Sequence, residues 1–132
     1  MSSASSIATA VTQVLSRFPQ VRLAILFGSC AKGNATTASD VDLAVQADKP
    51  LDAELSIRLI GAMAEQLGRP VDLIDLHTIG EPLLGEVLKG RRLRGSDTNF
   101  ARLITRHLLD AADFLPYRER ILSERRRQWK AS

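Results

Sequence analysis

The sequence has few of the features that would place it in a membrane, on a secretory route or among disulfide-stabilised domains. It contains one cysteine, Cys30, so no intramolecular disulfide can form, which favours a reducing cytoplasm. Its start lacks a basic segment followed by an apolar run, so no signal peptide is predicted. The longest apolar run, Leu23 to Phe27, is far shorter than the ~20 residues of a membrane-spanning helix. We therefore expect a cytoplasmic protein without a membrane contact.

Charge is unevenly divided along the 132 residues, a length that suits one domain with a single hydrophobic core. Residues 1–88 contain 6 basic and 10 acidic side chains, whereas residues 89–132 contain 12 basic and 5 acidic ones. An acidic body suits a divalent-metal site. A basic tail could meet an acidic partner or nucleic acid, although a solvated helix face would have the same composition.

The hydrophobic patterns predict one α/β domain that continues into a helical C-terminal extension. We expect helices over residues 3–18, 50–67, 81–88 and from 97 onward, and strands over residues 21–27, 40–47, 71–76 and 91–94. Pro116 is expected to break the last helix before a final basic helix. This organisation predicts a body over residues 1–95 and an extension over residues 96–132 that packs on the body or on a partner.

Two acids lie at the start of the second expected strand. Asp40 and Asp42 are two residues apart, so in a strand their side chains share one face, roughly 6.6 Å apart along the backbone. Neighbouring carboxylates repel each other unless cations lie between them, and hard oxygen ligands favour Mg²⁺. A third acid on a neighbouring strand would complete a two-metal site. Asp72 and Asp75 both stand between apolar residues of the third expected strand and face opposite sides of it.

A possible phosphate-binding turn follows the first expected strand. Gly28 has no Cβ, so a phosphate can approach the backbone closely at this strand end. Ser29 adds a hydroxyl donor and, if a short helix begins there, free backbone N–H groups. Lys32 lies one turn later, where its charge could reach the same anion.

Gly28-Ser29, ten residues, and then Asp40-Val41-Asp42 form a pattern that resembles the signature of the DNA polymerase β-like nucleotidyltransferase superfamily. The whole chain resembles the smallest members, the minimal nucleotidyltransferases (MNT) that are antitoxin-type partners of HEPN toxins. The resemblance covers residues 7–95 well and the tail loosely. It implies a small mixed β-sheet flanked by helices.

The resemblance also implies roles for individual residues. Asp40 and Asp42 would bind two Mg²⁺ ions, and Asp72 would bind one of them and activate the attacking hydroxyl. Gly28, Ser29 and Lys32 would hold the nucleotide. We favour Asp72 over Asp75 as the third acid, and Asp75 stays open as the alternative.

The reaction that the resemblance implies is the transfer of AMP from ATP to a protein hydroxyl, a tyrosine of a cognate HEPN toxin. A small molecule such as an aminoglycoside is an alternative acceptor, although such enzymes usually carry a larger second domain. A protein that neutralises a toxin by binding alone is a further alternative, but acids kept without metals would only destabilise the fold. We expect no direct nucleic-acid substrate, and the chain could form homo- or hetero-oligomers.

Overall fold

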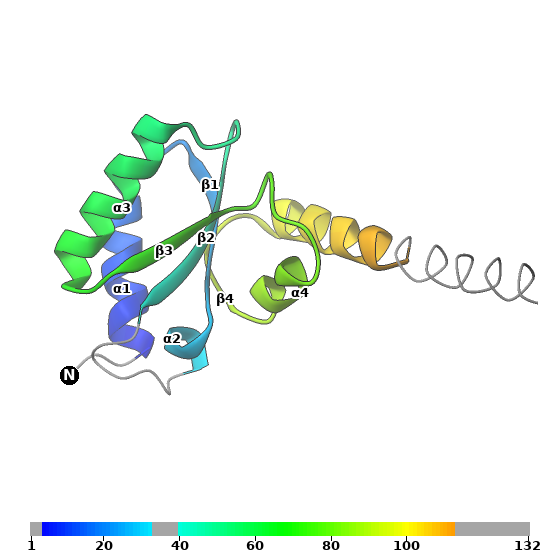
Figure 1. Ribbon diagram of the computed structural model, residues 1–132, viewed down its shortest axis with the longest axis horizontal. Helices are drawn as coiled ribbons and strands as arrows, with labels where there is room; N and C mark the ends of the chain where they lie inside the picture. The colour runs from blue at the N-terminus through cyan, green and yellow to red at the C-terminus, as the bar shows by residue number, and fades with distance from the viewer. Residues whose placement is uncertain (1–3, 33–39, 113–132) are drawn as a thin grey trace, which may run out of the picture.

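The computed structural model describes residues 4–32 and 40–112 (Figure 1). The elements follow in the order α1 (Ala4–Leu15), β1 (Val21–Phe27), α2 (Ser29–Lys32), β2 (Val41–Ala47), α3 (Ala53–Leu67), β3 (Val71–Asp75), α4 (Leu83–Leu88) and β4 (Arg91–Arg94). A further helix spans residues 97–112. Within these two ranges, no helix is both long and apolar enough to cross a membrane.

The four strands form one mixed sheet in the order β3-β2-β1-β4. β1 pairs antiparallel with β2 and with β4, whereas β2 and β3 are parallel. The end of β1 therefore lies beside the start of β2, and Phe27 is opposite Asp42. Because a parallel neighbour runs in the same direction, the start of β3 lies at this same edge, with Asp72 beside Asp42.

Each face of the sheet is covered by helices, which explains why β1 and β2 are almost continuously apolar. α1 and α3 cover one face, and α4 and the helix over residues 97–112 lie on the other (Figure 1). Alternate residues of a strand enter different core clusters: Leu26 packs with α1 and α3, whereas Ile25 and Phe27 pack with α4. We call these the α1/α3 face and the α4 face.

The mixed α/β architecture is confirmed, and the predicted helix boundaries are wrong by a few residues. The helix predicted from residue 50 begins at Ala53, because Asp52 is its N-cap and accepts a hydrogen bond of 2.7 Å from the backbone N–H of Leu55. Its end was predicted correctly, since Gly68 takes the left-handed conformation with φ of 67°. The helix predicted over residues 3–18 ends at Leu15.

The division into a body over residues 1–95 and an extension over 96–132 stays a prediction. The helix over residues 97–112 contributes Leu103, which is buried, to the core of the α4 face. Pro116 and the predicted final helix lie outside the described residues.

Candidate active site

The centre of the site is Asp42, the second residue of the central strand β2. Its side chain lies on the α4 face, because Ala44, two residues later, belongs to the core cluster of that face. Asp72 is its register partner on β3 and shares the face with Ile74. Asp42 is half-buried and Asp72 is exposed, so the pair lies at an open edge of the sheet.

Asp40 precedes the first residue of β2 and is exposed. Its backbone is held in place, because its carbonyl oxygen accepts a 3.5 Å hydrogen bond from Sγ of Cys30. The buried side chain of Arg69 also contacts this sulfur, 4.0 Å from Nη1. Cys30 is thus a buried packing residue that joins α2 to the start of β2.

The three aspartates act on each other electrostatically. Partial burial raises the pKa of Asp42 above its ordinary value, and the negative charges of Asp72 and then Asp40 raise it further. Oxygen ligands that carry such crowded negative charge suit a hard divalent cation. Among residues 4–32 and 40–112, no three His, Cys, Asp or Glu side chains are arranged so that they could hold a metal ion together. Ionised carboxylates repel each other, so a cation bound between them is needed to bring them close together.

Gly28 lets the carboxylate of Asp42 lie close against the end of β1. Its φ is 73°, a conformation that side chains rarely adopt, and a Cβ built on it would overlap Oδ2 of Asp42. A glycine is therefore required here for two independent reasons. The carboxylate of Asp42 takes the place of the missing side chain, on the face that also holds Asp72, and we call this close contact at the end of β1 the cradle.

Ser29 and Lys32 are the first and last residues of α2. Ser29 directly follows Gly28 at the cradle and is half-buried, and its role in nucleotide binding stays a prediction. The side chain of Lys32 lies outside the part of the chain that the structure describes.

Asp75 has a different environment from Asp72. It lies on the α1/α3 face, two residues after Leu73 of that core cluster. Its carboxylate accepts hydrogen bonds from the backbone N–H groups of Leu51 and His77, both at 2.9 Å. Asp75, the last residue of β3, therefore connects the loop before α3 with the loop after β3 through hydrogen bonds, at the end of the strands away from Asp42.

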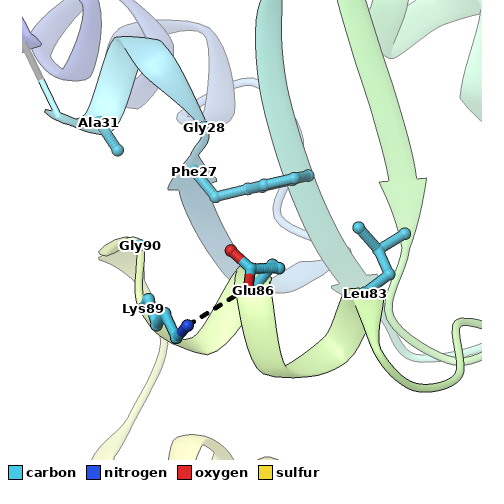
Figure 2. A pocket seen from close by; sticks show the side chains of 7 residues that line it. All are labelled: Phe27, Gly28, Ala31, Leu83, Glu86, Lys89 and Gly90. Atoms are coloured by element: carbon cyan, nitrogen blue, oxygen red, sulfur yellow. Dashed lines mark hydrogen bonds and ion pairs between the residues drawn. The ribbon is translucent and has the colours of Figure 1, made fainter. Parts of the chain in front are cut away.

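A hollow of about 270 Å³ lies beside the cradle, and the sequence reasoning did not predict it (Figure 2). It is lined by Phe27, Gly28, Ala31, Leu83, Glu86, Lys89 and Gly90. Gly90 brings the α4–β4 turn against β1, because a Cβ there would overlap the carbonyl oxygen of Leu26. The glycine between a short helix and an edge strand was the available signal for this close approach.

Comparison with known proteins identifies the family of this arrangement. The family described as "Polymerase beta, Nucleotidyltransferase" matches residues 9–99 of this sequence, which is more than half of the chain. The protein adenylyltransferase MntA of Shewanella oneidensis is 35% identical over 79 residues, 59% of this chain and 57% of that protein. The alignment thus spans little more than half the length of that relative.

Two solved structures share the fold over nearly the whole chain. A chain of a toxin–antitoxin crystal structure with AMP-PNP superposes with a TM-score of 0.76 at 26% identity, over 89% of this chain and 96% of the other. A second is a complex of a tri-AMPylated Shewanella oneidensis HEPN toxin with an MNT antitoxin. It gives a TM-score of 0.72 at 24% identity, over 92% of this chain and 97% of the other.

Proposed function

Because the chain belongs to the polymerase beta nucleotidyltransferase family, we propose that it transfers AMP from ATP to a hydroxyl of a partner protein. The acceptor that we propose is a tyrosine of a HEPN toxin, with the chain acting as its antitoxin. Support comes from the similarity to an adenylyltransferase and to toxin–antitoxin complexes, one with AMP-PNP and one with a tri-AMPylated toxin. The cytoplasm, where ATP and reduced thiols such as Cys30 are found, is the proposed compartment.

One observation carries the proposal: Asp42 and Asp72 lie side by side on one face, with the Asp42 carboxylate close against Gly28 at the end of β1. We assign Asp40, Asp42 and Asp72 to two Mg²⁺ ions, because three carboxylates at an open edge offer hard oxygen ligands. When bound, the ions would neutralise charge on the attacking and leaving oxygens. Gly28 and Ser29 would receive the phosphates, with Lys32 as a further cation.

The reaction is an in-line displacement at the α-phosphorus of ATP. The acceptor oxygen forms a bond to this phosphorus, the bond from phosphorus to the bridging oxygen breaks, and pyrophosphate leaves. Asp72 takes the hydroxyl proton, which a tyrosine does not readily release at neutral pH. Asp75 is excluded from this role in our proposal, because its carboxylate accepts two backbone hydrogen bonds on the other face.

The experiment that tests the proposal uses the full chain, a purified HEPN toxin, ATP and Mg²⁺, with mass spectrometry of the toxin. Wild type should add AMP units to the toxin, and Asp42→Asn should slow the transfer by roughly 100-fold or more, as expected when metal ligation is lost. Asp48→Asn is the matched control, because Asp48 lies beyond the other end of β2 in an exposed ion pair with Arg22. Equal rates in wild type and Asp42→Asn would contradict the assignment.

The same assay separates the remaining alternatives. If Asp42→Asn still neutralises the toxin without modifying it, the protein acts by binding alone. Asp72→Asn should lower turnover far more than ATP affinity, because its proposed role is in the transition state. If transfer survives in Asp72→Asn and is lost in a folded Asp75→Asn variant, the two roles must be exchanged.

A further inference from the structure

The hollow beside Gly28 lies on the far side of the active site from Asp72. On the α4 face, the sheet order places Asp72 on β3, then Asp42 on β2, then Gly28 at the end of β1. The next segment is the α4–β4 turn with Lys89, because Arg91, two residues later, pairs with Leu26 of β1. These positions therefore follow one another across a single edge of the sheet.

This order fixes the direction of the reaction, if the proposed function is correct. An in-line displacement places the attacking and leaving oxygens on opposite sides of the α-phosphorus. The acceptor hydroxyl lies at Asp72, so the leaving pyrophosphate must extend past Asp42 toward Gly28. From β3 to β1 there are two strand spacings, about 10 Å, so this path would bring the outer phosphates to the hollow.

A cationic side chain, that of Lys89, lines the hollow toward which the leaving pyrophosphate would extend. Lys89 lies at the end of the hollow near Gly90, and its Nζ is 3.3 Å from Oε1 of Glu86 (Figure 2). Both side chains are largely exposed, and an exposed ion pair of this kind contributes little to stability. A phosphate with a larger negative charge can therefore replace Glu86 as the partner of Lys89.

We propose that Lys89 binds the outer phosphates of the nucleotide and the pyrophosphate that leaves, and that Glu86 holds this lysine in place when no nucleotide is bound. The proposal rests on the proposed nucleotidyl transfer and adds to Gly28, Ser29 and Lys32 a further phosphate-binding residue, which lies outside the sequence pattern. The apolar walls of the hollow, Phe27 and Leu83, point to a competing occupant, the adenine base, which the experiment distinguishes.

The experiment measures the affinity of the full chain for ATP, ADP and AMP by calorimetry with Mg²⁺ present. Lys89→Ala should weaken ATP binding by roughly fivefold to tenfold, the loss of one charge-assisted contact at an exposed site, and leave AMP binding within about twofold. Competition by magnesium pyrophosphate should weaken in parallel. Glu86→Gln should strengthen ATP binding slightly, because it frees Lys89 and removes a negative charge.

Lys49→Ala is the matched control, since Lys49 is an exposed lysine beyond the opposite end of β2. Unchanged ATP affinity in Lys89→Ala, with wild type binding ATP, would overturn the inference and leave the proposed function intact. An equal loss for ATP and AMP would assign the hollow to the nucleoside and also overturn it. If wild type itself does not bind ATP, the proposed function fails, and the inference fails with it.

Discussion

At the scale of single residues, the site depends on a side chain that is missing. Gly28 has a positive φ, which residues with a side chain rarely adopt, and a Cβ at this position would overlap the carboxylate of Asp42. Both features disfavour any residue other than glycine. Most glycines of the chain are not constrained in this way. Gly61, within α3, has no atom within 4 Å of where a Cβ would lie.

This contrast yields a prediction for a pair of alanine substitutions. Gly28→Ala should lower the free energy of unfolding by roughly 1–2 kcal/mol, because of the φ of 73°, and should displace the Asp42 carboxylate and abolish transfer. Gly61→Ala should raise the free energy of unfolding by about 0.5–1 kcal/mol, since alanine is the better helix former. Urea unfolding and the toxin-modification assay measure both effects. Normal transfer by Gly28→Ala would show that the cradle is not needed.

The raised pKa of Asp42 predicts a dependence of stability on pH. The folded chain holds this proton more tightly than the unfolded chain, so the group favours the folded state at low pH. The contribution is lost as the pH rises through the raised pKa, and ionised Asp42 then destabilises the metal-free fold. With a chelator present, Asp42→Asn should therefore be more stable than wild type near neutral pH, and the difference should shrink in acid.

Thermal unfolding of both proteins at a series of pH values measures this difference directly. Asp48→Asn serves as the control, because its ion pair with Arg22 is exposed and screened by water, so its removal should change the free energy of unfolding very little. A metal-free Asp42→Asn variant that is less stable than wild type at neutral pH would contradict the prediction. Asp42 would then be stabilised by contacts that outweigh its repulsion from Asp72.

At the scale of elements, a strand could be predicted where its own residues form a clear apolar run. The pairing between strands that are distant in the sequence could not be predicted in this way. β1 is an apolar run that ends at a glycine, and its bounds were predicted correctly as residues 21–27. Asp72 and Asp75 could be placed on opposite faces by parity alone. Which face also holds Asp42 depends on the parallel register of β2 with β3, which no local pattern contains.

The hollow at α4 escaped prediction for the same reason. α4 is a six-residue helix, too short for its periodicity to indicate what it packs against. Its position comes from Leu84 and Val87 in the core of the α4 face and from the contact of Gly90 with β1. In the sequence, Lys89 therefore resembles an ordinary surface lysine, although the fold brings it to the same hollow that Gly28 lines.

Arg106 is one of the contacts that attach the helix over residues 97–112 to the body, and it predicts a second contrast. Arg106 donates hydrogen bonds to the carbonyl oxygens of Leu76 at 2.7 Å and of Ile79 at 3.0 Å. Arg106→Ala leaves both acceptors without this partner and should lower the free energy of unfolding by roughly 1–3 kcal/mol. Arg102→Ala, an exposed arginine on the same helix, should change it by less than about 0.5 kcal/mol. Similar urea midpoints for the two variants would show that the helix does not depend on Arg106.

At the scale of the whole molecule, the proposed catalytic residues and the most basic segment lie in different parts of the sequence. The acids of the site lie in residues 1–88, whereas residues 117–132 contain 6 basic and 2 acidic side chains and lie outside the described residues. Within residues 4–32 and 40–112, the two core clusters draw on residues from Ile7 to Leu103. We therefore predict that deleting residues 117–132 leaves a folded chain that still binds ATP.

Modification of the partner should respond differently to this deletion. A basic segment attracts an acidic surface over a distance, which raises the association rate and is screened by salt. At low salt and limiting toxin, the deletion should slow toxin modification by roughly tenfold, and the rate of the shortened chain should depend less on salt than that of wild type. A full-length variant with Arg125, Arg126 and Arg127 replaced by glutamine lowers the charge of this segment and keeps its aromatic residues, Tyr117 and Trp129. If that variant keeps the full rate and the deletion does not, residues of the segment other than these arginines contact the partner. Full activity of the deletion itself would exclude docking through this segment, and a deletion that fails to fold would assign the segment to the core.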